Sequence, residues 1–198
     1  MREFILRARK APSTPDFDLA DLSRSGHMEI VAHCLVDSLF YSRRIRDQTV
    51  FHLVLEGPAA PPKYVRFESD ALGSLGGLDD RAVCSVIQQA LEVGRRLGRE
   101  QEREAAAGVF VAKRSFESLV RAQCAKGPLF YLQPKGTDIR AAELAEPASF
   151  VFTDHLSMPS KSDRYLERLG ARPLSVGPRT LLASQCIVLV HNELDRRA

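Results

Sequence analysis

The sequence has no apolar segment long enough to cross a bilayer, which takes about 18 residues or more. The longest apolar run near the C-terminal end is only Cys186–Val190. At the other end, Met1–Arg7 places charges on both sides of three apolar residues. A signal peptide has a longer apolar stretch and a small-residue cleavage site. We therefore expect a protein that is neither secreted nor embedded in a membrane.

Cysteine is scarce and follows no metal-binding pattern. The four cysteines, at positions 34, 84, 124 and 186, form no Cys-x-x-Cys pair and have no histidine at zinc-finger spacing. This pattern argues against a structural zinc site and against a disulfide scaffold in a chain of 198 residues. Isolated thiols in apolar contexts are usually buried small side chains. We expect the chain to work in the reducing cytoplasm.

Neither sign of charge is in large excess. The chain has 28 Lys plus Arg against 25 Asp plus Glu, with 44% hydrophobic and 27% charged residues. That composition is ordinary for a globular protein, and the length suits one domain. Among the basic residues, 22 are Arg and 6 are Lys. Because arginine suits phosphates and base stacking, a nucleic-acid partner is permitted but not required.

The first half of the chain alternates between strands and helices. Apolar residues recur at a spacing of four over His27–Arg46, which predicts a helix ending in the basic turn Arg43–Arg46. The pair Asp79-Asp80 is expected to cap a second helix. The polar stretch Arg95–Glu104 is expected to be a solvated helix extension or a mobile loop. Strands are predicted at Glu3–Arg9, Thr49–Leu55 and Tyr64–Phe67.

In the second half the strands and helices are shorter and continue to alternate. Strands are predicted at Gly108–Ala112, Pro128–Leu132, Ser149–Thr153 and Pro173–Val176. Helices or helical turns are predicted at Ser115–Ala122, Asp138–Leu144 and Ser160–Leu169. Strands joined through helices form βαβ units and pair in parallel. The fold class is therefore α/β with a mainly parallel sheet.

The last segment fits two kinds of structure by its pattern alone. Cys186–Val190 could be a buried strand, whereas the apolar residues between Ala183 and Leu194 share one face of a helix. Pro178 is well placed near the start of a helix. We predict a helix here.

In open α/β sheets, ligands usually bind outside the carboxyl ends of the strands. The candidate binding loops follow predicted strands and are Leu132–Gly136, Thr153–Leu156 and Ser175–Pro178. The chain has no Gly-x-Gly-x-x-Gly after its first strand, no Gly-x-x-x-x-Gly-Lys-Ser/Thr and no Gly-x-Ser-x-Gly. These absences argue against dinucleotide-binding, P-loop and serine-hydrolase functions.

The adjacent Asp154 and His155 could serve in acid–base chemistry or bind a metal ion. Neighbours in sequence do not face each other on one element, and a metal ion needs more ligands than this pair supplies. We therefore predict no metal site and expect Asp154 to brace a loop or cap a helix. The residues alone indicate a cytoplasmic α/β protein with a pocket at the strand ends of its second half.

Several stretches together resemble one family. They are Met1–Arg9, Val65–Phe67, Phe150–His155, Leu174–Pro178 and Val188–Arg197, of which the ending His-Asn-Glu-Leu-Asp-Arg-Arg is the most specific. They are similar to the TrmY family, the archaeal methyltransferases acting on N1 of pseudouridine 54 in tRNA, and to its bacterial relatives. The family belongs to the SPOUT superfamily. The resemblance implies one domain over residues 1–198, with a trefoil knot near the C-terminal end.

The resemblance also implies a cofactor and a site. S-adenosylmethionine (SAM) would bind in the three candidate loops, where backbone groups hold its two ends. The implied contacts are Leu132, Thr153, Ser175, Val176, Gly177 and Cys186. Loss of the N1 proton of pseudouridine would be helped by a nearby base, and Asp154 is the acid inside a matched motif. Positioning supplies most of the remaining rate effect.

One departure from the family pattern leaves an alternative open. Archaeal members read Gly-Asp-His-Ile-Gly where this chain has Thr153–Ser157, so small hydroxyl residues replace both glycines. The alternative hypothesis is a SAM- and RNA-binding protein that has another RNA target, such as rRNA, or that does not catalyse methyl transfer. The first hypothesis remains an enzyme that methylates N1 of pseudouridine in structured RNA, most simply tRNA.

The apolar residues of the last segment also predict an assembly. Leu181, Leu182, Ile187, Val190 and Leu194 offer more apolar surface than one face of a small domain needs. SPOUT proteins usually pack their knot region against a twofold mate, and cyclic dimers are the commonest assembly. We expect a homodimer, with Leu182 and Val190 at the interface.

Overall fold

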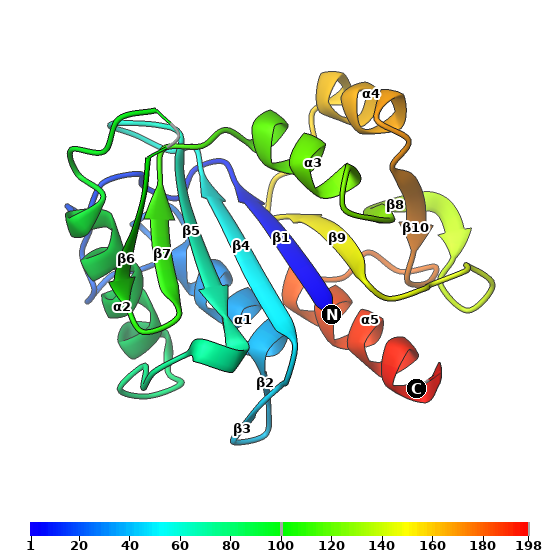
Figure 1. Cartoon of the computed structure of the whole chain (residues 1–198), viewed down its shortest axis with the longest axis horizontal. Helices are drawn as coiled ribbons and strands as arrows, with labels where there is room; N and C mark the ends of the chain where they lie inside the picture. Colours follow the sequence, from blue (N-terminus) through cyan, green and yellow to red (C-terminus); the bar gives the residue numbers. More distant parts are fainter. Residues whose placement is uncertain (100, 198) are drawn as a thin grey trace.

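A single eight-stranded sheet runs through the molecule in the order β10-β8-β9-β1-β4-β5-β7-β6 (Figure 1). We describe a computed structural model that covers residues 1–99 and 101–197. The strands of the sheet are β1 (Arg2–Ala8), β4 (Thr49–Leu55), β5 (Lys63–Glu68), β6 (Glu102–Ala106), β7 (Val109–Ala112), β8 (Leu129–Asp138), β9 (Ala148–Thr153) and β10 (Arg172–Ser175). A separate hairpin pairs β2 (Phe40–Tyr41) with β3 (Arg44–Ile45).

Five neighbouring strands of the sheet are parallel. β1 pairs in parallel with both β4 and β9, and β8 pairs in parallel with both β9 and β10. β5, β7 and β6 continue the sheet as antiparallel strands. The predicted α/β class with a mostly parallel sheet is confirmed. The first strand of the chain lies near the middle of this sheet.

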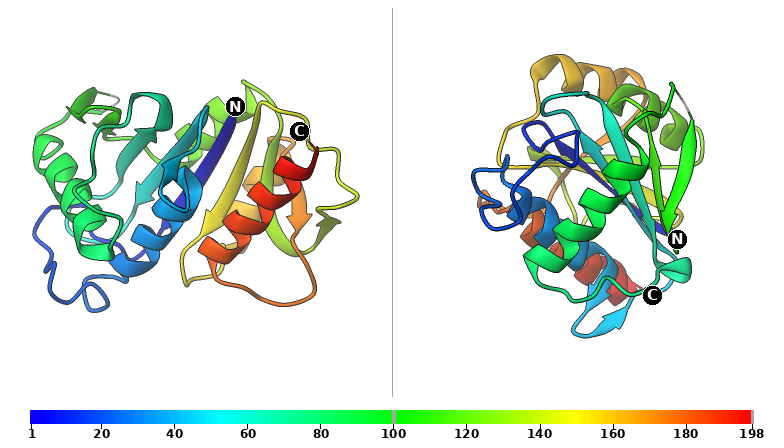
Figure 2. Two further views of the ribbon diagram at one scale, coloured as in Figure 1. Left: turned by 90° about the horizontal axis from the view of Figure 1, so that it is seen from below. Right: turned by 90° about the vertical axis from the view of Figure 1, so that its left-hand side faces the viewer.

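Helices cover both faces of the sheet (Figures 1 and 2). They are α1 (Met28–Leu39), α2 (Asp80–Val93), α3 (Phe116–Cys124), α4 (Ser160–Arg168) and α5 (Ala183–Arg197), with a 3-10 turn at Ser69–Ala71. Phe4 and Leu6 of β1 point into the core with α1, α2 and α5, whereas Ile5 points into the core with α3 and α4. A strand buried on both faces reads as a continuous apolar run, and in β1 that run is Phe4–Leu6.

The last segment is a helix, as predicted. Ile187, Val190 and Leu194 lie on one face of α5 at helical spacing and are buried in the same core as α1. The expectation that Val190 lies at a dimer interface is therefore wrong, since its side chain is fully enclosed within the protomer. Leu182 and Val188 remain exposed, at 59% and 48%.

The first long helix is shorter than its pattern predicts. α1 ends at Leu39, and Phe40 takes an extended conformation that starts the β2–β3 hairpin. The amide of Arg46 then donates to the carbonyl of Leu39 at 2.8 Å, which returns the chain to the helix end. The basic cluster Arg43–Arg46 is thus part of a hairpin and not a helix terminus. The spacing of four ends at Leu39, since the next position is Arg43, and Phe40 made the apolar pattern look longer than the helix.

Two other stretches also differ from their predictions. α2 ends at Val93, and the polar stretch after it returns to the sheet as edge strand β6, where Glu102 pairs with Arg66 at 2.7 Å. Glu100 lies outside the described residues. β8 continues through Asp138, so the helical turn predicted after it is reduced to one hydrogen-bonded turn, with the amide of Ala142 donating to the Asp138 carbonyl.

Candidate functional site at the carboxyl ends of the parallel strands

The three predicted binding loops lie together at the carboxyl ends of β8, β9 and β10. Tyr131 of β8 is level with Val151 of β9 and with Pro173 of β10. Leu132, which follows Tyr131, is therefore within a residue or two of the level of Thr153 and Ser175 across three adjacent strands. The structure thus brings together residues that the sequence separates by 21 to 43 positions.

The first loop is a bulge within β8 and not a loop after it. β8 pairs with β10 through Tyr131 and again from Thr137, so that Leu132–Gly136 lie outside the ladder. Gly136 lets the bulge return closely, because a Cβ there would lie 2.5 Å from the amide nitrogen of Leu174. The sequence signal for this close approach was the glycine itself.

Asp154 ties the second loop to the end of β1. Its Oδ2 accepts from the amide of Arg9 and its Oδ1 accepts from the amide of Leu156, both at 2.9 Å. Only 2% of the side chain is exposed. Both oxygens are already engaged, which is the geometry of a residue that fixes a loop.

The third loop follows β10 and is shaped by Ser175. The Ser175 hydroxyl lies 3.4 Å from the amide nitrogen and 3.3 Å from the carbonyl oxygen of Gly177. Gly177 has a φ of 146°, a conformation that favours glycine, and a Cβ there would meet no heavy atom within 4 Å. The loop is therefore open on the side where Gly177 lies.

Helices α1 and α5 flank these loops with two buried thiols. Burial raises the pKa of Cys34, and the nearby Asp37, Cys186 and Asp154 raise it further. Burial likewise raises the pKa of the Cys186 thiol. Both side chains stay protonated at neutral pH, so neither is a nucleophile, since the thiolate is the reactive form. They pack as small apolar side chains in the core below the loops.

The residues at this edge suit a ligand with both apolar and polar parts. Leu132, Val176 and Ala183 are partly buried apolar side chains that pack on the core below the loops. Thr153 and Ser175 add hydroxyls that are also partly exposed. An adenosine joined to a methionine needs this mixture of apolar contact and hydrogen-bonding groups. The predicted contact residues therefore fit SAM.

A cluster that the sequence did not point to borders the second loop. The ring centroid of His27, just before α1, lies 4.3 Å from that of His155. The Nδ1 of His27 lies 2.9 Å from Oε1 of Glu29. The sequence pattern indicated only that a helix starts at His27. Its contact with His155, 128 positions away, could not be predicted from the local sequence.

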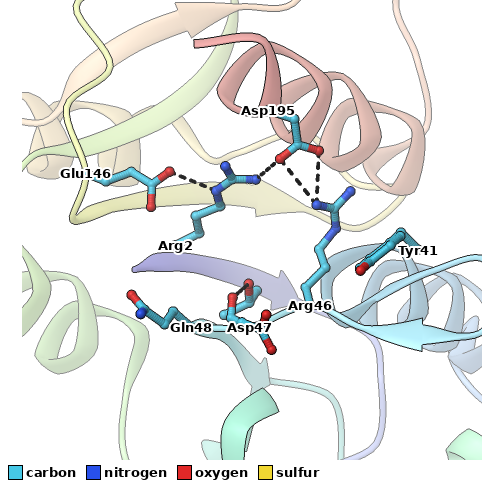
Figure 3. A pocket seen from close by; sticks show the side chains of 8 residues that line it. Arg2, Tyr41, Arg46, Asp47, Gln48, Glu146 and Asp195 are labelled. Atoms are coloured by element: carbon cyan, nitrogen blue, oxygen red, sulfur yellow. Dashed lines mark hydrogen bonds and ion pairs between the residues drawn. The ribbon is translucent and has the colours of Figure 1, made fainter. Parts of the chain in front are cut away.

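A hollow of about 450 Å³ lies at the amino ends of β1 and β4 (Figure 3). Arg2 there bonds to Glu146 at 2.9 Å and also to Asp195, and Arg46 reaches Asp195 at 3.1 Å. Partial burial works to raise the pKa of Asp195, but these arginines outweigh it and lower that pKa. Because the charges already neutralise one another, this hollow fits a structural tie between α5 and β1.

Metal ligands and membrane spans give no further candidates. Within residues 1–99 and 101–197, no three His, Cys, Asp or Glu side chains are grouped so that they could hold a metal ion. Among the helices described, none combines the length and the apolar character that crossing a membrane requires. All four cysteines are free.

Comparison with known proteins places the chain in a family. A family model described as "Putative SAM-dependent RNA methyltransferase" matches residues 1–198. Proteins named "Putative pseudouridine methyltransferase" include one from Shewanella frigidimarina, 41% identical over the full length of both chains. Another, from Photobacterium profundum, is 40% identical over 98% of both chains.

Comparison of folds agrees with this placement. The crystal structure of Archaeoglobus fulgidus Nep1 bound to S-adenosylhomocysteine matches 98% of this chain and 96% of its own, with a TM-score of 0.62. At 12% identity this likeness concerns the fold alone. The sequence match over the whole chain and the relatives at about 40% identity decide the family. This chain is therefore a member of the SAM-dependent RNA methyltransferase family.

Proposed function

We propose that this chain transfers a methyl group from SAM to N1 of a pseudouridine in structured RNA, with position 54 of tRNA as the favoured target. The match of the family model to the entire chain carries this proposal. The names of the full-length relatives support pseudouridine as the base. The loops at the carboxyl edge of β8, β9 and β10 offer a site of the required chemistry.

In this proposal the three loops hold the methyl donor. SAM supplies a methyl group on a positively charged sulfur, which needs little chemical help beyond alignment. Leu132, Val176 and Cys186 provide the apolar walls, and Thr153, Ser175 and Gly177 provide hydroxyl and backbone groups. We assign Asp154 a positioning role, since its oxygens hold the second loop onto the end of β1.

The chain is also proposed to act as one domain, with the trefoil knot of the SPOUT superfamily in its C-terminal part. The continuous sheet from β10 to β6 supports one domain. We propose a homodimer through the exposed Leu181, Leu182 and Val188, at the start and outer side of α5. Four unpaired thiols and an RNA substrate suit the cytoplasm.

The reaction is tested with purified protein, methyl-labelled SAM and three RNAs. They are a tRNA with pseudouridine at position 54, the same tRNA with uridine there, and an rRNA fragment containing pseudouridine. We expect label only in the first RNA, recovered as N1-methylpseudouridine by nucleoside mass spectrometry. Label in the rRNA alone would replace the target. SAM binding by calorimetry without transfer to any RNA would favour the non-catalytic alternative. The replacement of two family glycines by Thr153 and Ser157 is the observation that motivates this alternative.

The donor site is tested separately by binding. Leu132→Glu and Val176→Glu place a charge on partly exposed apolar walls, and we expect each to weaken SAM affinity by about tenfold or more, or at least about 1.4 kcal/mol. Leu78→Glu is the matched control, because Leu78 is 36% exposed and lies before α2, away from the loops. Unchanged affinity in both site variants would contradict the assignment.

A further inference from the structure

The pair of His27 and Glu29 has the geometry of a carboxylate–imidazole base. Nδ1 of His27 lies 2.9 Å from Oε1 of Glu29, so the carboxylate keeps the proton on that nitrogen. The other nitrogen, Nε2, is then a proton acceptor. The side chain of His27 is 42% exposed, which leaves it accessible to a large substrate such as RNA.

Two features show that this pair is held under constraint. His27 has a φ of 61°, in the left-handed region that non-glycine residues rarely adopt. Such backbone conformations are strained and cluster at functional sites. In addition, Oε2 of Glu29 is buried without a hydrogen-bond partner, and buried polar atoms of this kind call for an explanation.

The pair lies beside the candidate donor site. The His27 ring is in contact with the ring of His155, which directly follows Asp154 in the second loop. The 24% exposed side chain of His155 leaves this contact at the rim and not in the core. The pseudouridine of the RNA must approach this same rim of the second loop to reach the methyl group of SAM.

We propose that His27 is the general base that accepts the N1 proton of the target pseudouridine, and that Glu29 positions its ring. This inference rests on the proposed function. A bond forms between N1 and the methyl carbon, and the electron pair of the broken carbon–sulfur bond stays on sulfur. The N1 proton passes to Nε2 of His27, which releases it to water after the product leaves.

Several charged groups surround this pair. Glu29 belongs to α1 itself, Asp154 and His155 come from the loop after β9, and Arg9 follows β1 and bonds to the Ser157 carbonyl. The loop before α1 adds the ion pair of Asp21 with Arg24, and α2 adds Asp80, which pairs with His33. Carboxylates and cations therefore both lie on the elements around the imidazole that is proposed to accept the proton.

The kinetic test replaces His27 with asparagine. Asparagine tolerates the left-handed backbone, and its amide nitrogen can keep the bond to Glu29, but it has no group in place of Nε2. We expect His27→Asn to lower kcat/KM at pH 7 by about 100-fold or more and to leave SAM affinity within twofold of wild type. Its rate should rise more steeply with pH than the wild-type rate, because the N1 proton must then leave to solvent without a side-chain acceptor. The matched control is His33→Asn on α1, which removes another histidine paired with a carboxylate, since Nε2 of His33 lies 3.0 Å from Oδ1 of Asp80.

A second readout does not depend on turnover. Nitrogen-15 NMR of the SAM-free protein is expected to show His27 protonated on Nδ1, and Glu29→Gln is expected to change that tautomer distribution. A His27→Asn variant with wild-type rate and pH profile would overturn the inference while leaving the proposed function intact. A wild-type chain that binds SAM and methylates no pseudouridine RNA would overturn both.

Discussion

His191 is a titratable residue enclosed between α5, α1 and β1. Its Nε2 donates to the carbonyl of Ser38 at 2.9 Å, and its ring centroid is 4.4 Å from that of Phe4. Burial, helped by the nearby Arg46, lowers the pKa of His191 to about 3. The folded protein therefore holds this ring neutral under conditions in which an unfolded chain would protonate it.

This difference gives a pH-dependent stability of known sign. Between the unfolded value of 6.5 and about 3, the unfolded state binds the extra proton, so stability falls as pH decreases. From pH 7 to pH 5 we expect His191 to account for a loss of about 2 kcal/mol. His191→Gln retains a donor for the Ser38 carbonyl and should show a shallower loss in urea titrations at the two pH values. An equal loss of stability between pH 7 and pH 5 in the wild type and in His191→Gln would contradict the assignment of this pH dependence to His191.

Gly136 carries a steric requirement at the β8 bulge. Because an added Cβ would lie 2.5 Å from a backbone nitrogen of β10, Gly136→Ala should force the two strands apart. We expect a loss of about 1–3 kcal/mol of stability, measured by thermal and urea unfolding, together with weaker SAM binding. Lys135→Ala, at the exposed neighbouring position, serves as control and should be near neutral.

At the scale of elements, helix α2 depends on the residue that caps its start. Asp79 accepts from the amide of Ala82 at 3.0 Å as the N-cap. Asp79→Ala should cost about 1 kcal/mol, whereas Asp79→Ser should cost little because serine caps comparably well. Urea unfolding monitored by circular dichroism tests this ranking. Equal stabilities for the two variants would show that the cap bond contributes nothing.

The sequence predicted the elements whose signals are local. The strand Thr49–Leu55 matches β4 in both bounds, and the predicted helix cap at Asp79 is confirmed. The β2–β3 hairpin was missed because its stability comes from distant groups. Arg46 there pairs with Asp195, and its guanidinium lies 5.1 Å from the Tyr41 ring. No periodicity records a contact across 149 residues.

The candidate site was predictable where its signals are local, and not where it depends on contacts between distant parts of the chain. Asp154 and the residues that follow the strands could be placed because parallel strands end at one edge. The bulge at Leu132–Gly136 and the meeting of His27 with His155 depend on how separate parts of the chain pack. The general base proposed from the structure is therefore a different residue from the acid favoured by the sequence.

At the scale of the whole molecule, the exposed apolar surface around α5 predicts association. Leu182 and Val188 are 59% and 48% exposed on the same helical region. Leu182→Glu and Val188→Glu should each weaken a dimer by about tenfold or more without unfolding the protomer, as measured by analytical ultracentrifugation. Val93→Glu, 38% exposed on α2, is the matched control. A wild-type monomer at micromolar concentration that still binds SAM would contradict a dimer-dependent site.

The central place of β1 has a consequence for synthesis on the ribosome. β1 pairs with β4 on one side and with β9 on the other. The edge of β1 that pairs with β9 therefore stays unpaired until about 140 further residues have been synthesised. Until then the nascent chain presents an open, apolar strand edge of the kind that recruits chaperones or other chains. One of the proposed donor loops follows β9, which closes this edge, and the other two belong to β8 and β10, which lie beyond β9 in the sheet. Binding competence is consequently the last property that the growing polypeptide acquires.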